Sequence, residues 1–171
     1  SLTSAPELKA TTLANGCYFG MFNGCASLTA APKLPATELE RLCYGDIFCN
    51  CTSLESAPEL PATKLAENCY YEMFSGCTSL TSAPKLSAIE LAEACYCKMF
   101  RGCENLSSVT MLAPSDKIKN TSSSFNDWLD KAGTKATTRT LKVTDEAAYT
   151  ALKSKTDYLP TEWQIGSNCT V

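Results

Sequence analysis

Cysteine is the residue type here with the widest possible chemistry, because the 171-residue chain contains eleven cysteines and no histidine. Thiols can act as nucleophiles, pair as disulfides or bind metal ions. Without histidine, however, the chain cannot form a Ser-His-Asp triad, a Cys-His dyad or a histidine-ligated metal site. An odd number of cysteines also leaves at least one thiol without a partner in the chain. The composition therefore excludes much of the enzyme chemistry that operates at neutral pH.

Eight of the eleven cysteines occupy two columns of one repeat, and within a column they are 26 positions apart. The columns are Cys17, Cys43, Cys69 and Cys95, then Cys25, Cys51, Cys77 and Cys103. Leucine, proline, tyrosine and phenylalanine positions recur at the same spacing. A strict period of this length indicates a solenoid, in which each unit stacks on its neighbours. Residues 1–112 hold four full repeats and a partial fifth, and residues 113–171 are predicted to form a C-terminal cap continuous with the array.

Three interpretations of the cysteine columns are open: buried apolar fillers that form weak hydrogen bonds, disulfides, or metal ligands. Metal binding is disfavoured, because there is no C-x-x-C pair and a column supplies only one ligand per layer. Layers about 4.8 Å apart approach disulfide distances, but pairing two layers would leave their neighbours unequal. We therefore favour buried free thiols and predict no metal site. Unusual thiol chemistry is expected, if anywhere, at Cys49, Cys97 and Cys169, which lie outside the columns.

Within one repeat, the sequence predicts a strand, a turn, a helix and a second turn. Residues 54–60 are short, extended in pattern and interrupted by proline, as is typical of a brief strand. Residues 65–77 place apolar side chains at a helical spacing, with Thr63 as the predicted N-cap and Gly76 as the stop. Stacking such units predicts an α/β solenoid, with short parallel strands on one side and short helices on the other.

The C-terminal segment predicts four elements of its own. Residues 125–132 indicate a short helix, residues 138–144 a strand, residues 145–155 a helix and residues 162–165 a last strand. Bulky residues in such an atypical unit can cover the apolar end of the array, and Trp128, Tyr158 and Trp163 are the expected covers. The alternative is a separate carbohydrate-binding module with exposed tryptophans.

The repeat resembles the BspA-like leucine-rich repeats of bacterial surface proteins, especially a variety found in Bacteroides-type bacteria. The resemblance rests on a leucine-containing strand ending in proline and on Met73-Phe74-Ser75-Gly76-Cys77, with its copies in the other repeats. The units are longer than is common in that family, and Ala57 stands where a larger aliphatic residue is usual. The resemblance implies a right-handed leucine-rich-repeat solenoid, secreted or on the outer cell surface. It implies adhesion or host interaction and carries no catalytic residues or cofactor.

Binding is expected where the repeats differ, since packing explains the matching columns. The candidate ligand surface is an aromatic row: Tyr18, Phe19, Tyr44, Tyr70, Tyr71 and Tyr96. An exposed row of rings could hold glycans or peptides, whereas the alternative is that the rings pack between stacked helices. Two hypotheses for function remain: a non-enzymatic adhesion or binding protein, and a structural spacer or display stalk for another domain.

The charge and hydropathy of the chain limit the classes of partner that it is expected to bind. A net charge of −3 and a pI near 5.0 argue against nucleic-acid binding. The sequence has no apolar signal region or membrane-spanning stretch, and it begins inside a repeat, so we expect a signal peptide to lie outside this segment. We expect a monomer whose partner is a protein or a glycan, including one derived from a host, in the extracellular space.

Overall fold

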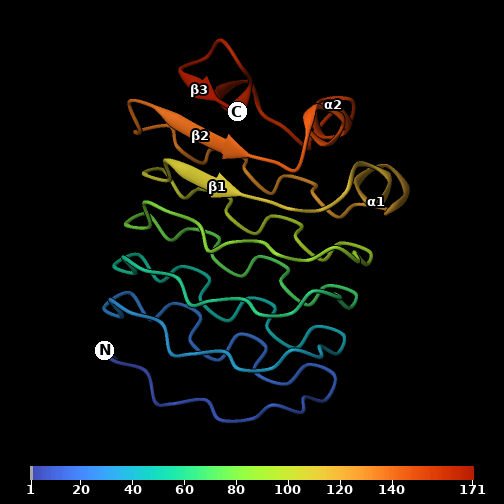
Figure 1. Ribbon diagram of the computed structural model, residues 1–171. Coiled ribbons are helices and arrows are strands. Elements are labelled where there is room, and N and C mark those ends of the chain that lie inside the picture. Colours follow the sequence, from blue (N-terminus) through green and yellow to red (C-terminus); the bar gives the residue numbers. More distant parts are fainter. Residues whose placement is uncertain (1) are drawn as a thin grey trace.

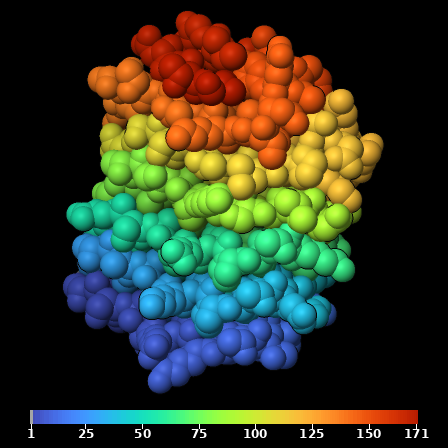
Figure 2. Space-filling model, viewed as in Figure 1, coloured from blue at the N-terminus to red at the C-terminus, as the bar shows by residue number. Residues whose placement is uncertain are grey.

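The computed structural model describes residues 2–171, and the chain winds through layers that stack from the N-terminus to the C-terminus (Figure 1; Figure 2). Parallel bridges join residues 26 positions apart in successive layers, such as Ala30 with Ser56 and Lys64 with Glu90. Among the described residues, regular elements occur only from Ser108 onward. They are β1 (Ser108–Thr110), α1 (Ser115–Asn120), β2 (Arg139–Lys142), α2 (Glu146–Lys153), the 3₁₀-helix η1 (Thr161–Trp163) and β3 (Cys169–Thr170).

The three strands form one parallel sheet in the order β1-β2-β3. In Figure 1 they lie above one another in successive layers, and α1 and α2 lie above one another on another side of the stack. The chain is therefore a small α/β protein with a parallel sheet, and this part of the predicted fold class is confirmed.

The prediction of a helix in each repeat is wrong, because residues 65–77 form consecutive turns instead. Alternate N–H groups close turns within the layer, as Tyr71 does to the Asn68 carbonyl at 3.2 Å. The others donate to the next layer, as Tyr70 does to Cys95 at 3.1 Å. A helix would use all these donors internally and leave none for the neighbouring layer. Positive φ angles at every fourth residue, at Asn68, Glu72 and Gly76, also exclude a helix.

The strand predicted at residues 54–60 is reduced to one isolated parallel bridge, between Ser56 and Ala30. Pro58 has no N–H to donate, and the same column holds proline in every full repeat. A longer ladder forms at β1, where Val109 pairs with Leu141 of β2. The fifth unit has no proline at this point, so its strand can continue.

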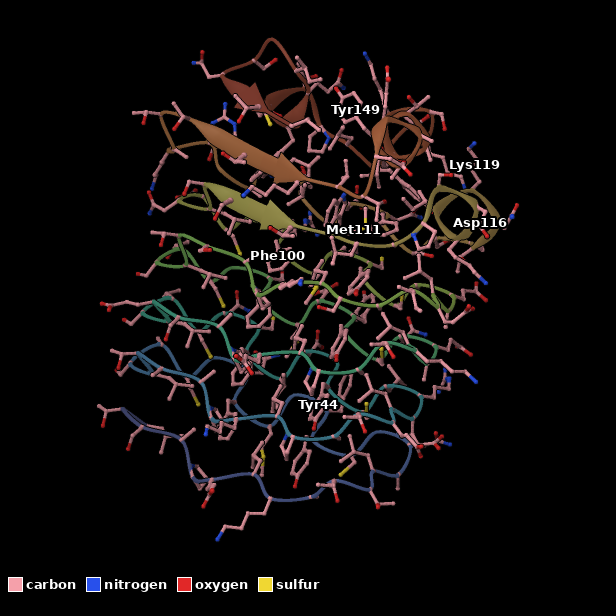
Figure 3. All side chains as sticks on the ribbon, viewed as in Figure 1. Tyr44, Phe100, Met111, Asp116, Lys119 and Tyr149 are labelled. Carbon is pink, nitrogen blue, oxygen red and sulfur yellow. The ribbon has the colours of Figure 1, made fainter. Side chains whose placement is uncertain are left out.

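Two aromatic columns run through the core of the repeats. Phe22, Phe48, Phe74 and Phe100 stack with ring centroids 5.6–5.8 Å apart, and Tyr18, Tyr44, Tyr70 and Tyr96 stack at 5.9–6.3 Å. Figure 3 shows Tyr44 and Phe100 inside the stack. Tyr44, Tyr70 and Tyr96 are each only 1% exposed. Their place in the predicted ligand surface is therefore corrected: these three rings hold the layers together and cannot meet a ligand.

The layered arrangement extends past residue 112. Residues 122–135 form turns rather than the predicted helix, and they accept hydrogen bonds from the fourth repeat. The Tyr70 N–H donates to Cys95 in the next layer, whereas the equivalent Tyr96 N–H donates to Ser124, three positions further along than the repeat would place its acceptor. The three additional residues accompany α1, which the four full repeats lack. The Phe125 ring packs against Tyr96 at a tilt of 37°, with centroids 5.5 Å apart, and thus continues the tyrosine column.

Two of the predicted C-terminal elements are confirmed, as β2 and α2. The Asp145 side chain caps α2 by accepting from the Ala148 N–H at 2.8 Å. The strand predicted at residues 162–165 is wrong, since this segment begins with η1 and the last strand lies at β3.

Both tryptophans are buried in the C-terminal layers, with no exposed area. Trp163 Nε1 donates to the Ala132 carbonyl at 3.0 Å, and Trp128 Nε1 donates to the Tyr158 carbonyl. Tyr158 is 2% exposed, so all three expected covers lie in the core. The alternative of a module with exposed tryptophans is therefore wrong.

Candidate functional site

Three columns of the repeat vary in residue type and lie in the turn segments, and we call them the variable face. Its members are Phe19, Gly45, Tyr71 and Cys97; Gly20, Asp46, Glu72 and Lys98; and Asn23, Cys49, Ser75 and Arg101. The turn hydrogen bond from the Cys49 N–H to the Asp46 carbonyl, 3.0 Å long, brings the second and third columns together. The hydrogen bond from the Asp46 N–H to the Tyr71 carbonyl, 2.8 Å long, links this turn to the next layer.

A cluster of three metal-ligating side chains lies within the variable face. Asp46 and Cys49 come from one layer and Glu72 from the next, and their donor atoms all lie within 4.8 Å of one another. Cys49 is 6% exposed, whereas the two carboxylates are partly exposed. We call these residues the Asp46–Cys49–Glu72 cluster. It combines one soft sulfur with two hard oxygens.

Lys98 supplies the positive charge nearest to this cluster. Its Nζ lies 3.3 Å from the Glu72 carboxylate and donates to the Tyr71 hydroxyl at 3.4 Å. The same ammonium lies 5.6 Å from the centroid of the Tyr71 ring, which is within cation–π distance. Glu72 is therefore held by a neighbour from the layer above it, and the variable face connects three successive repeats.

Burial and like charge set the protonation of the cluster. Burial raises the pKa of Asp46, the nearby Glu72 carboxylate raises it further, and Lys98 opposes both. Burial raises the pKa of Cys49 to about 11, and the Asp46 and Glu72 carboxylates add to this effect. A protonated thiol is a poor nucleophile. The raised pKa therefore disfavours nucleophilic chemistry at Cys49.

The other two cysteines outside the columns are not activated either. Burial raises the pKa of Cys97, although Lys98 lowers it in part. Burial also raises the pKa of Cys169. A reactive thiol needs a lowered pKa and some exposure, and these residues have neither.

The column cysteines have a structural role. All eleven thiols are free, and nine of them are buried. Three donate to a carbonyl of the preceding layer: Cys51 to Phe22, Cys77 to Phe48 and Cys103 to Phe74, at 3.0–3.1 Å. These contacts match the first interpretation of the cysteines, in which the thiol is a buried filler and a weak hydrogen-bond donor.

The backbone at the centre of the variable face is left-handed in every layer. Gly20, Asp46, Glu72 and Lys98 have φ angles of 49–61°. For residues with a Cβ this conformation costs roughly 1–2 kcal/mol relative to the right-handed region. Glycine removes that cost in the first layer, yet the next three layers carry charged side chains. Leu42 and Ala94 in another column have the same conformation, so the turn geometry of the stack imposes it whatever the side chain.

Three members of the predicted aromatic row remain near the surface. Phe19 is 47% exposed, and Tyr18 and Tyr71 are partly exposed. The ring of Phe19 lies over Gly45, because a Cβ added to Gly45 would meet ring atoms at 3.0 Å. Phe19 and Tyr71 thus belong to the same column of the variable face, at one edge of the Asp46–Cys49–Glu72 cluster.

The chain has no match among protein-family models, curated proteins or solved structures. Among residues 2–171, no helix combines the length and the apolar character needed to cross a membrane. Any statement of function therefore depends on the repeat pattern and on the geometry of the variable face.

Proposed function

We propose that the chain is a non-catalytic binding protein, built as a BspA-like leucine-rich-repeat solenoid and acting at or outside a bacterial cell surface. It would serve adhesion to a protein or a glycan. One observation carries the proposal: the leucine, tyrosine and phenylalanine columns that recur are mostly buried, whereas three columns that change between repeats lie together in the turn segments.

The recurring columns supply the scaffold. Leu28, Leu54, Leu80 and Leu106 have no exposed area, and the phenylalanine column is equally buried from the second layer onward. In each repeat these recurring residues therefore pack against the neighbouring repeats, as stacked repeats require. A scaffold of this kind leaves the turn segments free to vary without loss of the fold.

The variable face supplies the recognition chemistry. Phe19 and Tyr71 offer aromatic area, and Asn23 and Arg101 are exposed polar groups. Aromatic residues and arginine contribute most to binding energy at protein interfaces. Rings beside hydrogen-bonding side chains also suit sugars, which present apolar faces and hydroxyl edges.

A spacer is the second candidate, favoured by the continuity of the stack. Layers are joined by backbone hydrogen bonds from residue 16 to residue 135, and such a body could hold another domain at a distance. A spacer does not need the variable face, however, because its length and rigidity do not depend on which residues lie at the surface.

The test is a binding screen with paired variants. The protein is applied to arrays of glycans and of extracellular-matrix proteins, together with Phe19→Ser/Arg101→Ser on the variable face. The matched control is Glu55→Ala/Thr81→Ala, which changes two exposed residues on the bridge side of the stack.

We expect a ligand that binds the parent protein and the control but loses at least about tenfold in affinity for the face variant, since hot-spot residues each contribute about 2 kcal/mol or more. Silence across both arrays, or equal loss in both variants, would overturn the binding proposal and leave the spacer as the better account.

A further inference from the structure

We propose that Asp46, Cys49 and Glu72 form a binding site for one zinc ion that connects the second and third layers. The site does not depend on the adhesion proposal, because a zinc ion could bind here whatever partner the variable face recognises.

The donor set suits zinc better than the common alternatives. Zinc accepts cysteine sulfur together with aspartate and glutamate oxygen, usually in tetrahedral geometry. Calcium and magnesium bind oxygen ligands, so the buried sulfur disfavours them. Three protein ligands would leave a fourth position for water, which is the arrangement of an open zinc site.

Zinc binding requires the donor atoms to move closer together by no more than about 1.5 Å. Bond lengths of about 2.3 Å to sulfur and 2.0–2.2 Å to oxygen place tetrahedral ligands about 3.3–3.7 Å apart. The three donor atoms already lie within 4.8 Å of one another. Asp46 and Cys49 are held by one turn, whereas Glu72 has a longer side chain that can close the remaining gap. The ion would then bridge two layers through side chains.

An unsatisfied oxygen points to a missing ligand. Asp46 Oδ1 is shielded from solvent and has no hydrogen-bond partner among residues 2–171. A buried carboxylate oxygen without a partner is costly, and a bound cation would remove that cost. Lys98 does not fill this role, because its ammonium contacts Glu72 and Tyr71.

The sulfur of Cys49 is placed differently from the column sulfurs. Cys51, Cys77 and Cys103 donate their S–H to a carbonyl of the layer below. Cys49 Sγ instead accepts a hydrogen bond from the Asn50 amide at 3.4 Å. A metal-bound thiolate is supported by such donors in the surrounding shell. Among these four cysteines, Cys49 alone therefore has the surroundings of a ligand.

The experiment is metal titration of the reduced, metal-free protein. Zinc binding is followed by calorimetry, and cobalt(II) is used as a spectroscopic probe of sulfur ligation. We expect one ion per chain and a thiolate-to-cobalt charge-transfer band. Cys49→Ser should abolish the band and weaken zinc binding by more than the ~10–100-fold that loss of a supporting residue costs. Asp46→Asn should weaken it as strongly, while asparagine tolerates the left-handed backbone there.

Matched controls separate ligation from general damage. Cys97→Ser removes a buried thiol outside the cluster, and Asp127→Asn removes an acid with a similarly left-handed backbone, φ 52°. Both controls should bind zinc like the parent. Binding by Cys49→Ser at the parent's affinity, loss of the cobalt band in Cys97→Ser, or failure of the parent to bind one ion would each overturn the site.

A second variant keeps the test decisive if Cys49→Ser fails to fold. Lys98→Gln removes the ammonium that competes with a metal for Glu72, so zinc should bind several-fold more tightly. Unchanged or weaker binding by this variant would contradict the proposed geometry. None of these results bears on the array screen, so zinc binding and adhesion can fail separately.

Discussion

The repeats and the C-terminal layers reach the same stacked shape by different means. Residues 2–104 contain no α-helix and only isolated bridges, yet their aromatic rings and thiols are in register from layer to layer. Residues 105–171 contain every strand and helix of the structure that is described. In the repeats, order comes from contact with a neighbour of similar sequence and the same conformation. In the C-terminal layers, it comes from local elements with their own caps and pairing.

This difference determines how far a destabilising substitution should spread in each region. A repeat depends on the layers on both sides, so damage in a middle layer should spread along the stack. An element such as α2 has its own internal hydrogen bonds and cap, so damage there should stay more local. Both tryptophans lie in the C-terminal layers, so tryptophan fluorescence reports on that region separately from circular dichroism of the whole chain.

Alkaline pH should produce the largest loss in free energy of unfolding, and chiefly in the repeats, which hold ten of the eleven cysteines. Burial raises the pKa of Cys43 and Cys51 to about 11 and that of Cys95 to about 12, from an ordinary 9.0. The folded state therefore favours the protonated thiols, and this stability is present below pH 9 and lost as the pH rises toward 12. At pH 10.5 the loss from Cys95 alone is about 2 kcal/mol. Urea unfolding of the reduced protein at pH 8 and pH 10.5 measures the total.

The control for this prediction is Cys95→Ala, which lacks one titrating thiol. Its free energy of unfolding should fall by about 2 kcal/mol less than that of the parent over the same pH interval. An equal fall in both proteins would mean that the thiols do not cause the alkaline loss. Ionisation of lysines and tyrosines is common to both proteins and cancels in the difference.

Removing a ring from the middle of the stack should have the next largest effect. Phe74 has no exposed area and stacks between Phe48 and Phe100, so Phe74→Ala should cost about 3–5 kcal/mol. Phe22 in the first layer stacks on one ring only, so Phe22→Ala should cost less. Denaturant unfolding followed by circular dichroism gives both values. Equal costs would contradict the claim that a repeat depends on neighbours on both sides.

The layered architecture could be predicted from the sequence because the strict repeat period forces equivalent residues into columns. The sequence could not show that residues 65–77 form turns rather than a helix. Apolar side chains such as Tyr70 and Phe74 recur at every fourth position in these turns, which is close to the spacing in a helix. Over one repeat, a period of 4 cannot be distinguished from 3.6. A better signal was present in the first repeat: Gly16, Gly20 and Gly24 are evenly spaced at every fourth position, and all three have positive φ. Glycine at that spacing favours left-handed turns over a helix.

The Asp46–Cys49–Glu72 cluster could be predicted only in part. The variation at these three columns was visible, and so was the position of Cys49 outside the cysteine columns. A single cysteine column supplies one ligand per layer, and on that basis the sequence disfavours metal binding. In the structure, a single turn brings Asp46 and Cys49 of one layer together, and Glu72 joins them from the next. Convergence across columns depends on turn geometry, which the repeat period does not specify.

The smallest predicted change in stability comes from helix capping, and it distinguishes Asp145, which caps a helix, from Thr63, which does not. Asp145 caps α2 through its side chain, so Asp145→Ala should cost about 1 kcal/mol, and Asp145→Asn, which keeps a capping oxygen, much less. Thr63 has the same apparent role in the sequence, but no helix follows it. Thr63→Ala should therefore stay within about 0.5 kcal/mol of the parent, as an exposed substitution does. Urea unfolding by tryptophan fluorescence and circular dichroism measures all three. If Thr63→Ala cost as much as Asp145→Ala, residues 65–77 would depend on a cap after all. The division between a region organised by its neighbours and one organised by local elements would then fail.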